Sequence, residues 1–204
     1  MIFSGFAAVI IKKFYHIPVF LHVHGGDLNL YEKSPSYYQK IYDYSLFNAD
    51  LIIANSKSVK NKLIKLSKIK KNKIIILSPG VNYDIFHQLT PEEISKYQDI
   101  YNLDKHRIVL LFAGNAIKRK GLDILIQALK NLKNNELKKI FLLVCSDGPE
   151  INKAIAEMEN LNIPDRSYKI LNKVNQIDLN IFYNLATAFI FPSRDEPLGL
   201  VGIE

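Results

Sequence analysis

Short apolar runs that alternate with helix-like segments are the feature that most limits the fold of this 204-residue chain. An uninterrupted apolar run favours a strand buried on both faces, and apolar residues three or four positions apart favour an amphipathic helix. The strand-like runs are 18–23, 51–54, 73–77, 108–113, 140–145, 168–171 and 188–191. The helix-like segments are 6–15, 37–47, 58–66, 122–132, 150–160 and 179–185. This alternation predicts an α/β protein in which crossover helices cover parallel sheets.

The strand pattern is interrupted once, between Ser78 and His106. Pro79-Gly80 and Thr90-Pro91 fall in this interval, and such pairs are typical of turns and loops. The sequence therefore predicts two groups of strands and helices, 1–81 and 107–204, joined by a connection over 82–106.

Charge and cysteine content limit the partners and the compartment. The chain has 27 basic and 20 acidic residues, and its net charge of +7 suits phosphorylated ligands, an anionic membrane surface or nucleic acid. Many of the lysines lie within the segment 57–73, spread around a predicted helix and its end. Their distribution favours a solvated surface over a binding stripe. The single cysteine, Cys145, excludes an intrachain disulfide and favours the reducing cytoplasm. The apolar N-terminal stretch 1–11 is too short to span a bilayer.

Three polar turns follow strands of the second group, and a parallel sheet brings such turns to one rim, where α/β proteins bind ligands. They are 114–121, 146–150 and 192–200. In the first turn, Arg119 can place its guanidinium fork on phosphate oxygens and Lys120 adds a compact positive charge next to a helix start. The carboxylates of Glu196 and Glu204, which seven residues separate, can accept hydrogen bonds from sugar hydroxyls. These turns predict a site for a phosphorylated, sugar-bearing ligand.

Several motifs resemble those of the retaining glycosyltransferases of family 4. They are Phe112-Ala113-Gly114 with Arg119-Lys120-Gly121, Ser146-Asp147-Gly148-Pro149, and Phe191-Pro192-Ser193 leading into Glu196-Pro197-Leu198-Gly199-Leu200 and ending at Glu204. The last of these matches the E-x7-E motif of the family. Ala54-Asn55-Ser56 and Pro79-Gly80-Val81-Asn82 resemble its first lobe. The resemblance implies the GT-B fold with two Rossmann-like lobes, the first within 1–81 and the second within 107–204, both incomplete.

The resemblance also implies a reaction and roles for individual residues. A sugar would pass from a nucleotide-sugar donor to a saccharide or glycolipid acceptor, with retention of configuration, without a metal or other cofactor, and in contexts such as polysaccharide biosynthesis. Arg119 and Lys120 would stabilise the departing diphosphate, Glu196 would contact the transferred sugar, and His24 would face that sugar from the first lobe. The residues implied to bind the sugar donor are Gly114, Asn115, Val174, Leu198, Gly199, Leu200 and Glu204. Two departures stand out, because Asn115 occupies a position where the family often has arginine and Ser146 replaces a common glycine.

Other functions stay open at this point. His22 and His24 point to one face of a strand with Asp27 nearby, as in a metal-dependent hydrolase, although His16, His87 and His106 are poorly placed to complete a ligand set. A non-catalytic nucleotide-sugar-binding fragment is a further alternative. We expect no nucleic-acid partner, because the tyrosines and phenylalanines mostly follow the core pattern. Peripheral contact with a membrane surface stays open.

Overall fold

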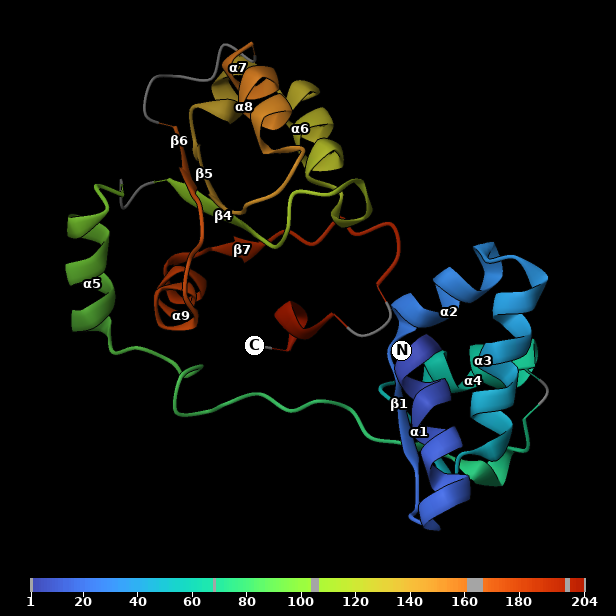
Figure 1. Ribbon diagram of the computed structural model, residues 1–204. Coiled ribbons are helices and arrows are strands. Elements are labelled where there is room, and N and C mark those ends of the chain that lie inside the picture. Colours follow the sequence, from blue (N-terminus) through green and yellow to red (C-terminus); the bar gives the residue numbers. More distant parts are fainter. Residues whose placement is uncertain (1, 68, 104–106, 161–166, 197–198, 204) are drawn as a thin grey trace. The chain divides into compact units, whose positions relative to one another are not determined.

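The computed structural model describes residues 2–67, 69–103, 107–160, 167–196 and 199–203. The chain divides into two compact units (Figure 1). The first unit is Met1–Gly80 with Glu196–Gly199, and the second is Val81–Asp195 with Leu200–Glu204.

The first unit contains a parallel sheet in the order β1-β2-β3. Its elements are α1 (Ile2–Tyr15), β1 (Phe20–Val23), α2 (Gly25–Lys33), α3 (Ser36–Asn48), β2 (Leu51–Ala54), α4 (Lys57–Ser67), the 3-10 turn η1 (Lys71–Lys73) and β3 (Ile74–Ile76). Ile52 in the central strand pairs with Leu21 and with Ile74. The core combines these strands with apolar residues of all four helices, including Val9, Leu28, Tyr42 and Leu63. Removal of this apolar surface from water stabilises the unit.

The second unit contains a parallel sheet in the order β6-β5-β4-β7. Its elements are α5 (Pro91–Ile100), β4 (Ile108–Ala113), the 3-10 turn η2 (Lys118–Lys120), α6 (Leu122–Lys130), α7 (Asn134–Leu137), β5 (Ile140–Cys145), α8 (Ile151–Glu159), β6 (Tyr168–Leu171), α9 (Gln176–Leu185), β7 (Ala188–Phe189) and the 3-10 turn η3 (Leu200–Gly202). Successive residues of β4 point to opposite faces, so Phe112 joins the core under α6 and α8 while Leu111 joins the core under α9. Figure 1 shows α6 and α8 on one side of this sheet and α9 on the other. The predicted helix-covered parallel sheet is therefore present in this unit.

Three described helices occupy stretches where the sequence analysis expected none: α2, α5 and the short α7. The helix α2 begins at Gly25, within the expected polar turn, because Asp27 accepts a hydrogen bond from the His24 backbone N–H (3.0 Å) and Leu28 is buried. The helix α5 lies within the stretch 82–106 and starts with a capping box in which Thr90 and Glu93 bond each other's backbone N–H groups. Capping hydrogen bonds thus start α2 and α5 at glycine and proline residues that the sequence analysis assigned to turns.

No described helix is long and apolar enough to cross a membrane.

Candidate functional site

A hollow of about 240 Å³ lies at the carboxyl ends of three neighbouring strands of the second unit. Gly114 and Asn115 follow β4, Ser146 and Asp147 follow β5, and Lys173 and Val174 follow β6, and all six line the hollow. Such a position, outside the carboxyl ends of parallel strands, is where open α/β sheets bind ligands. Gly114, Asn115 and Val174 were predicted from the sequence to bind one ligand, and the structure brings them together.

Hydrogen bonds between the turns fix the shape of this hollow. Ser146 is buried, with 4% of the residue exposed, and its hydroxyl donates a hydrogen bond to the Gly114 carbonyl at 2.6 Å. The Gly114 backbone N–H donates to the Cys145 carbonyl at 3.0 Å, and the Ala116 N–H donates to the Asp147 carbonyl at 2.6 Å. Ser146, which departs from the common glycine, therefore joins the β4 and β5 turns through its side chain.

Cys145 lines the same hollow but is not suited to act as a nucleophile. Its side chain is buried, and that burial raises the pKa of the thiol to about 12, with a smaller contribution from the charge of Asp178. A nucleophilic cysteine requires the thiolate form. The thiol therefore stays neutral near pH 7.

The basic loop, defined here as residues 114–121, leads from β4 through η2 to α6. At its end Gly121 has a positive φ of 77° and lies so close to Pro192 that an added Cβ would be 2.1 Å from the Pro192 carbonyl oxygen. Arg119 donates from Nη1 to the Asp195 carbonyl at 2.8 Å, and the Lys120 Nζ lies 5.5 Å from the centroid of the Phe191 ring. The basic loop thus packs along the segment 191–195, and its two predicted cations are held against that segment rather than in the lining of the hollow.

Arg194 is a residue that the sequence analysis did not single out. Its Nη1 and Nη2 atoms each lie 2.8 Å from a carboxylate oxygen of Asp123, in a two-bond fork. The hydrogen bond from Arg194 lowers the pKa of the Asp123 carboxyl below its usual range, and the opposite charge adds to the effect. Asp123 is in the first turn of α6, 71 residues away in sequence, so no local motif could have revealed the pair.

The geometry at the rim of the second unit agrees with comparisons to known proteins. The sequence profile of the family "Glycosyl transferases group 1" matches residues 93–204, which is more than half of the chain. The chain belongs to this glycosyltransferase family. A second profile, "Glycosyltransferase Family 4", matches residues 1–85.

Relatives extend over nearly the whole chain. An uncharacterized glycosyltransferase of Methanocaldococcus jannaschii is 28% identical over 203 residues, which are 98% of this chain and 50% of the relative. The capsular polysaccharide biosynthesis glycosyltransferase CapM of Staphylococcus aureus is 30% identical over 164 residues, which are 78% of this chain and 42% of CapM. The crystal structure of Anabaena HepE in complex with UDP is similar with a TM-score of 0.81 at 17% identity, over 96% of this chain and 52% of HepE. The predicted α/β fold of the GT-B type is therefore confirmed, and the chain spans about half the length of these proteins.

The E-x7-E motif of this family member is described only in part. Glu196 is half-buried, and Gly199, which is buried, has a φ of 70° just before the backbone turn that Leu200 begins. Leu198 and Glu204 lie outside the described residues. Roles for Glu196, Gly199, Leu200, Leu198 and Glu204 stay predictions.

His24 belongs to the first unit, where it precedes the first residue of α2 and is exposed. The ring centroids of His22 and His24 are 4.3 Å apart. Partial burial lowers the pKa of His22, as does the neighbouring His24, and Asp27 opposes both. Within the residues that the structure describes, no group of three or more histidine, cysteine, aspartate or glutamate side chains is arranged to hold a metal ion. The hydrolase alternative built on His22 and His24 thus gains no further ligand from the described chain.

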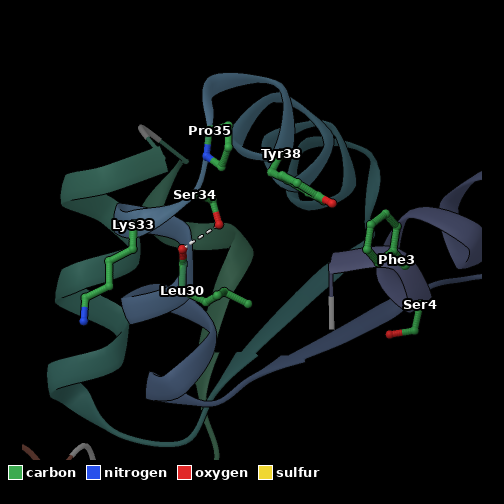
Figure 2. A pocket seen from close by; sticks show the side chains of 7 residues that line it. All are labelled: Phe3, Ser4, Leu30, Lys33, Ser34, Pro35 and Tyr38. Carbon is green, nitrogen blue, oxygen red and sulfur yellow. Dashed lines mark hydrogen bonds between the residues drawn. The ribbon is translucent and has the colours of Figure 1, made fainter.

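The first unit also has a hollow of about 570 Å³, between α1, α2 and α3. Figure 2 shows the aromatic rings of Phe3 and Tyr38 on one side, with centroids 5.6 Å apart, and Leu30 and Lys33 on the other. The Ser34 hydroxyl donates to the Leu30 carbonyl at 2.7 Å. This hollow is larger than the one at the carboxyl ends of the second sheet, but none of the predicted site residues lines it. Chemistry rather than size therefore selects the candidate site in the second unit.

Proposed function

We propose that the protein transfers a sugar, with retention of configuration, from a nucleotide-sugar donor to a saccharide or lipid-linked glycan acceptor in the cytoplasm. The observation that supports this most is the convergence of the β4, β5 and β6 turns on one hollow in a chain that belongs to a glycosyltransferase family. HepE, which shares the fold, was crystallised with UDP. A nucleoside diphosphate is the ligand that the polar turns and the basic loop of the same unit would suit by their chemistry.

The basic loop would act through electrostatics. As the bond between sugar and phosphate breaks, negative charge grows on the leaving diphosphate, and the fixed charges of Arg119 and Lys120 favour that transition state over the ground state. The reaction would need no metal ion, since these cations take the role of a neutralising metal. Gly199, Leu200, Leu198 and Glu204 would bind the sugar donor, and Glu196 and His24 would contact the transferred sugar.

The test measures UDP binding by calorimetry and sugar transfer by mass spectrometry, with the anomeric configuration of the product read by NMR. Replacement of Lys120 by alanine is expected to lower kcat/KM about 30-fold to 1000-fold, which corresponds to about 2 to 4 kcal/mol of lost transition-state stabilisation. The matched control is Lys138→Ala, which removes the same charge from an exposed position in the same unit and should leave kcat/KM unchanged.

The outcomes separate the alternatives. Tight UDP binding without transfer to any saccharide or lipid-linked acceptor would favour the non-catalytic nucleotide-sugar binder. Equal losses for Lys120→Ala and Lys138→Ala would refute the assignment of the basic loop. Full activity after treatment with EDTA is expected, and activity that depends on added Mn²⁺ or Mg²⁺ would contradict the metal-free mechanism.

A further inference from the structure

Arg194 makes contacts that hold the basic loop as well as Asp123. Its Nη1 donates to the Lys118 carbonyl at 2.5 Å, and its backbone N–H donates to the Arg119 carbonyl at 2.8 Å. Together with the fork on Asp123, one residue bonds three residues of the stretch 118–123. The peptide planes that lead to the side chains of Arg119 and Lys120 are therefore fixed from outside the loop.

Three neighbouring contacts also join the basic loop to the segment 191–195. Arg119 donates to the Asp195 carbonyl, Lys120 lies over the Phe191 ring, and Gly121 lies against Pro192. The segment 191–195 is itself anchored in the sheet, because β7 pairs with β4 and the Ile190 N–H donates to the Leu111 carbonyl at 2.7 Å. The conformation of the basic loop thus depends on a segment that is more than 70 residues away in sequence and is attached to the core.

Charge and geometry point to an indirect role for Arg194. Its guanidinium is satisfied by the Asp123 carboxylate and the Lys118 carbonyl, so its positive charge is already matched inside the protein. The side chains of Arg119 and Lys120 extend from the stretch of backbone that Arg194 fixes through the Lys118 and Arg119 carbonyls. Only arginine presents a planar fork that can bind a carboxylate through two bonds and still reach a carbonyl.

We propose that Arg194, paired with Asp123, is a positioning residue that preorganises Arg119 and Lys120 to receive the diphosphate of a nucleotide ligand. The proposal rests on the proposed function in its choice of ligand, whereas the ordering of the basic loop follows from the contacts alone. A loop that is ordered before binding spares the ligand the entropic cost of immobilising two long cationic side chains. The ion pair itself is partly exposed, with 38% and 31% of the two side chains accessible, so its effect on global stability is small.

The experiment compares Arg194→Lys and Asp123→Asn with the wild-type protein. Arg194→Lys keeps the net charge but removes the fork, so long-range attraction of an anion is unchanged. The matched control is Lys130→Gln, which breaks the ion pair of Lys130 with Glu157 (3.1 Å) at the other end of the same helix, α6. The measurements are hydrogen–deuterium exchange of the stretch 117–121, the melting temperature, and calorimetric binding of UDP and of inorganic pyrophosphate.

In both Arg194→Lys and Asp123→Asn, exchange over 117–121 should accelerate, including at the Lys120 amide that donates to the Ile117 carbonyl. The Kd for UDP should rise about tenfold, as expected when binding must order two additional side chains. The Kd for pyrophosphate should rise by a similar factor, and the melting temperature and the control variant should stay close to wild type.

Unchanged exchange in Arg194→Lys would overturn the proposal, as would faster exchange with unchanged affinity for both anions. A loss of affinity in Lys130→Gln equal to that in Arg194→Lys would also overturn it, because the loss would then follow from breaking any ion pair of α6 and not from the contacts of Arg194 with the basic loop. If the wild-type protein bound pyrophosphate through this loop but bound neither UDP nor GDP, the proposed function would fail while the positioning role of Arg194 would hold.

Discussion

Replacement of Gly121 by alanine tests the close packing of the basic loop against the segment 191–195. Gly121 has a φ of 77° and a ψ of 24°, and an alanine Cβ would lie 2.1 Å from the Pro192 carbonyl oxygen and 2.9 Å from its carbon. The left-handed backbone costs an L-residue about 1 to 2 kcal/mol. Relief of the overlap with a backbone atom adds about 1 to 3 kcal/mol, as for overpacked cores. We therefore expect Gly121→Ala to lower the free energy of unfolding of the second unit by about 2 to 5 kcal/mol.

Two other glycines of the same unit separate these contributions. Gly114 has a φ of 148°, but the nearest described atom to an added Cβ, the Lys120 Cδ, would be 3.9 Å away, so Gly114→Ala measures backbone strain without overlap, about 1 to 3 kcal/mol. No atom of the described residues lies within 4 Å of a Cβ at Gly202, and Gly202→Ala should change stability by less than about 0.5 kcal/mol. The expected order of destabilisation is Gly121→Ala, then Gly114→Ala, then Gly202→Ala.

The assay is a urea titration in which hydrogen–deuterium exchange of the β4 and β5 peptides reports unfolding. These strands form the centre of the second sheet, so their exchange reports the unfolding of this unit and not of the first. A Gly121→Ala variant as stable as Gly202→Ala would refute the close approach to Pro192. Equal losses for Gly121→Ala and Gly114→Ala would show that strain alone determines the cost.

Three further predictions concern single groups. The Tyr42 hydroxyl is buried and has no hydrogen-bond partner among the described residues, so Tyr42→Phe should leave the unfolding free energy unchanged or raise it by up to about 1 kcal/mol in a urea titration. A clear loss of stability would contradict this environment. Because burial raises the pKa of Cys145 to about 12, the native thiol should resist iodoacetamide at pH 8 and react on unfolding, and rapid native labelling, followed by mass spectrometry, would refute the burial. Arg194 lowers the folded-state pKa of Asp123, so the ion pair stabilises the protein above the unfolded pKa of about 4 and this contribution is lost as the pH falls through the lower folded value. The stability difference between wild type and Asp123→Asn in urea titrations, which is small at pH 7 because the pair is partly exposed, should therefore shrink further as the pH falls below about 5, and a difference that does not change with pH would refute the pairing.

Apolar runs in the sequence placed four strands at both ends. The runs 51–54, 108–113, 140–145 and 168–171 correspond to β2, β4, β5 and β6 at both ends. β4 and β5 are mostly buried, β2 is buried on one face and β6 is half-buried along its length. The apolar pattern was therefore enough to place these strands. For the same reason the turns that follow β4, β5 and β6, and with them the hollow, could be placed from the sequence.

Helices whose starts contain turn-forming residues were harder to predict. Gly25 and Gly26 have low helix propensity, and burial of Leu28 and the Asp27 cap outweigh it in α2. Thr90-Pro91 suggested a break, yet threonine followed by proline, with Glu93 at the third helical position, is also a helix start. A search for capping boxes would have found α5.

The contacts of Arg194 could not have been predicted from a local sequence pattern, because Arg194 and Asp123 are 71 residues apart in the sequence. The sequence indicated that Arg119 and Lys120 were cations of a site, but not that the Asp195 carbonyl and the Phe191 ring would hold them. Such information exists only once β7 has brought the segment 191–195 beside the basic loop.

The pairing of β7 with β4 also has a consequence for biosynthesis. β4, β5 and β6 are consecutive and can associate as the ribosome releases them, but Val109 in β4 donates to the Thr187 hydroxyl, 78 residues later. Until that late segment emerges, one edge of β4 has no strand beside it, and an apolar edge invites pairing with another chain. We expect the nascent second unit to be most vulnerable to aggregation just before β7 is synthesised, and closure of this edge to be the slow step of its folding.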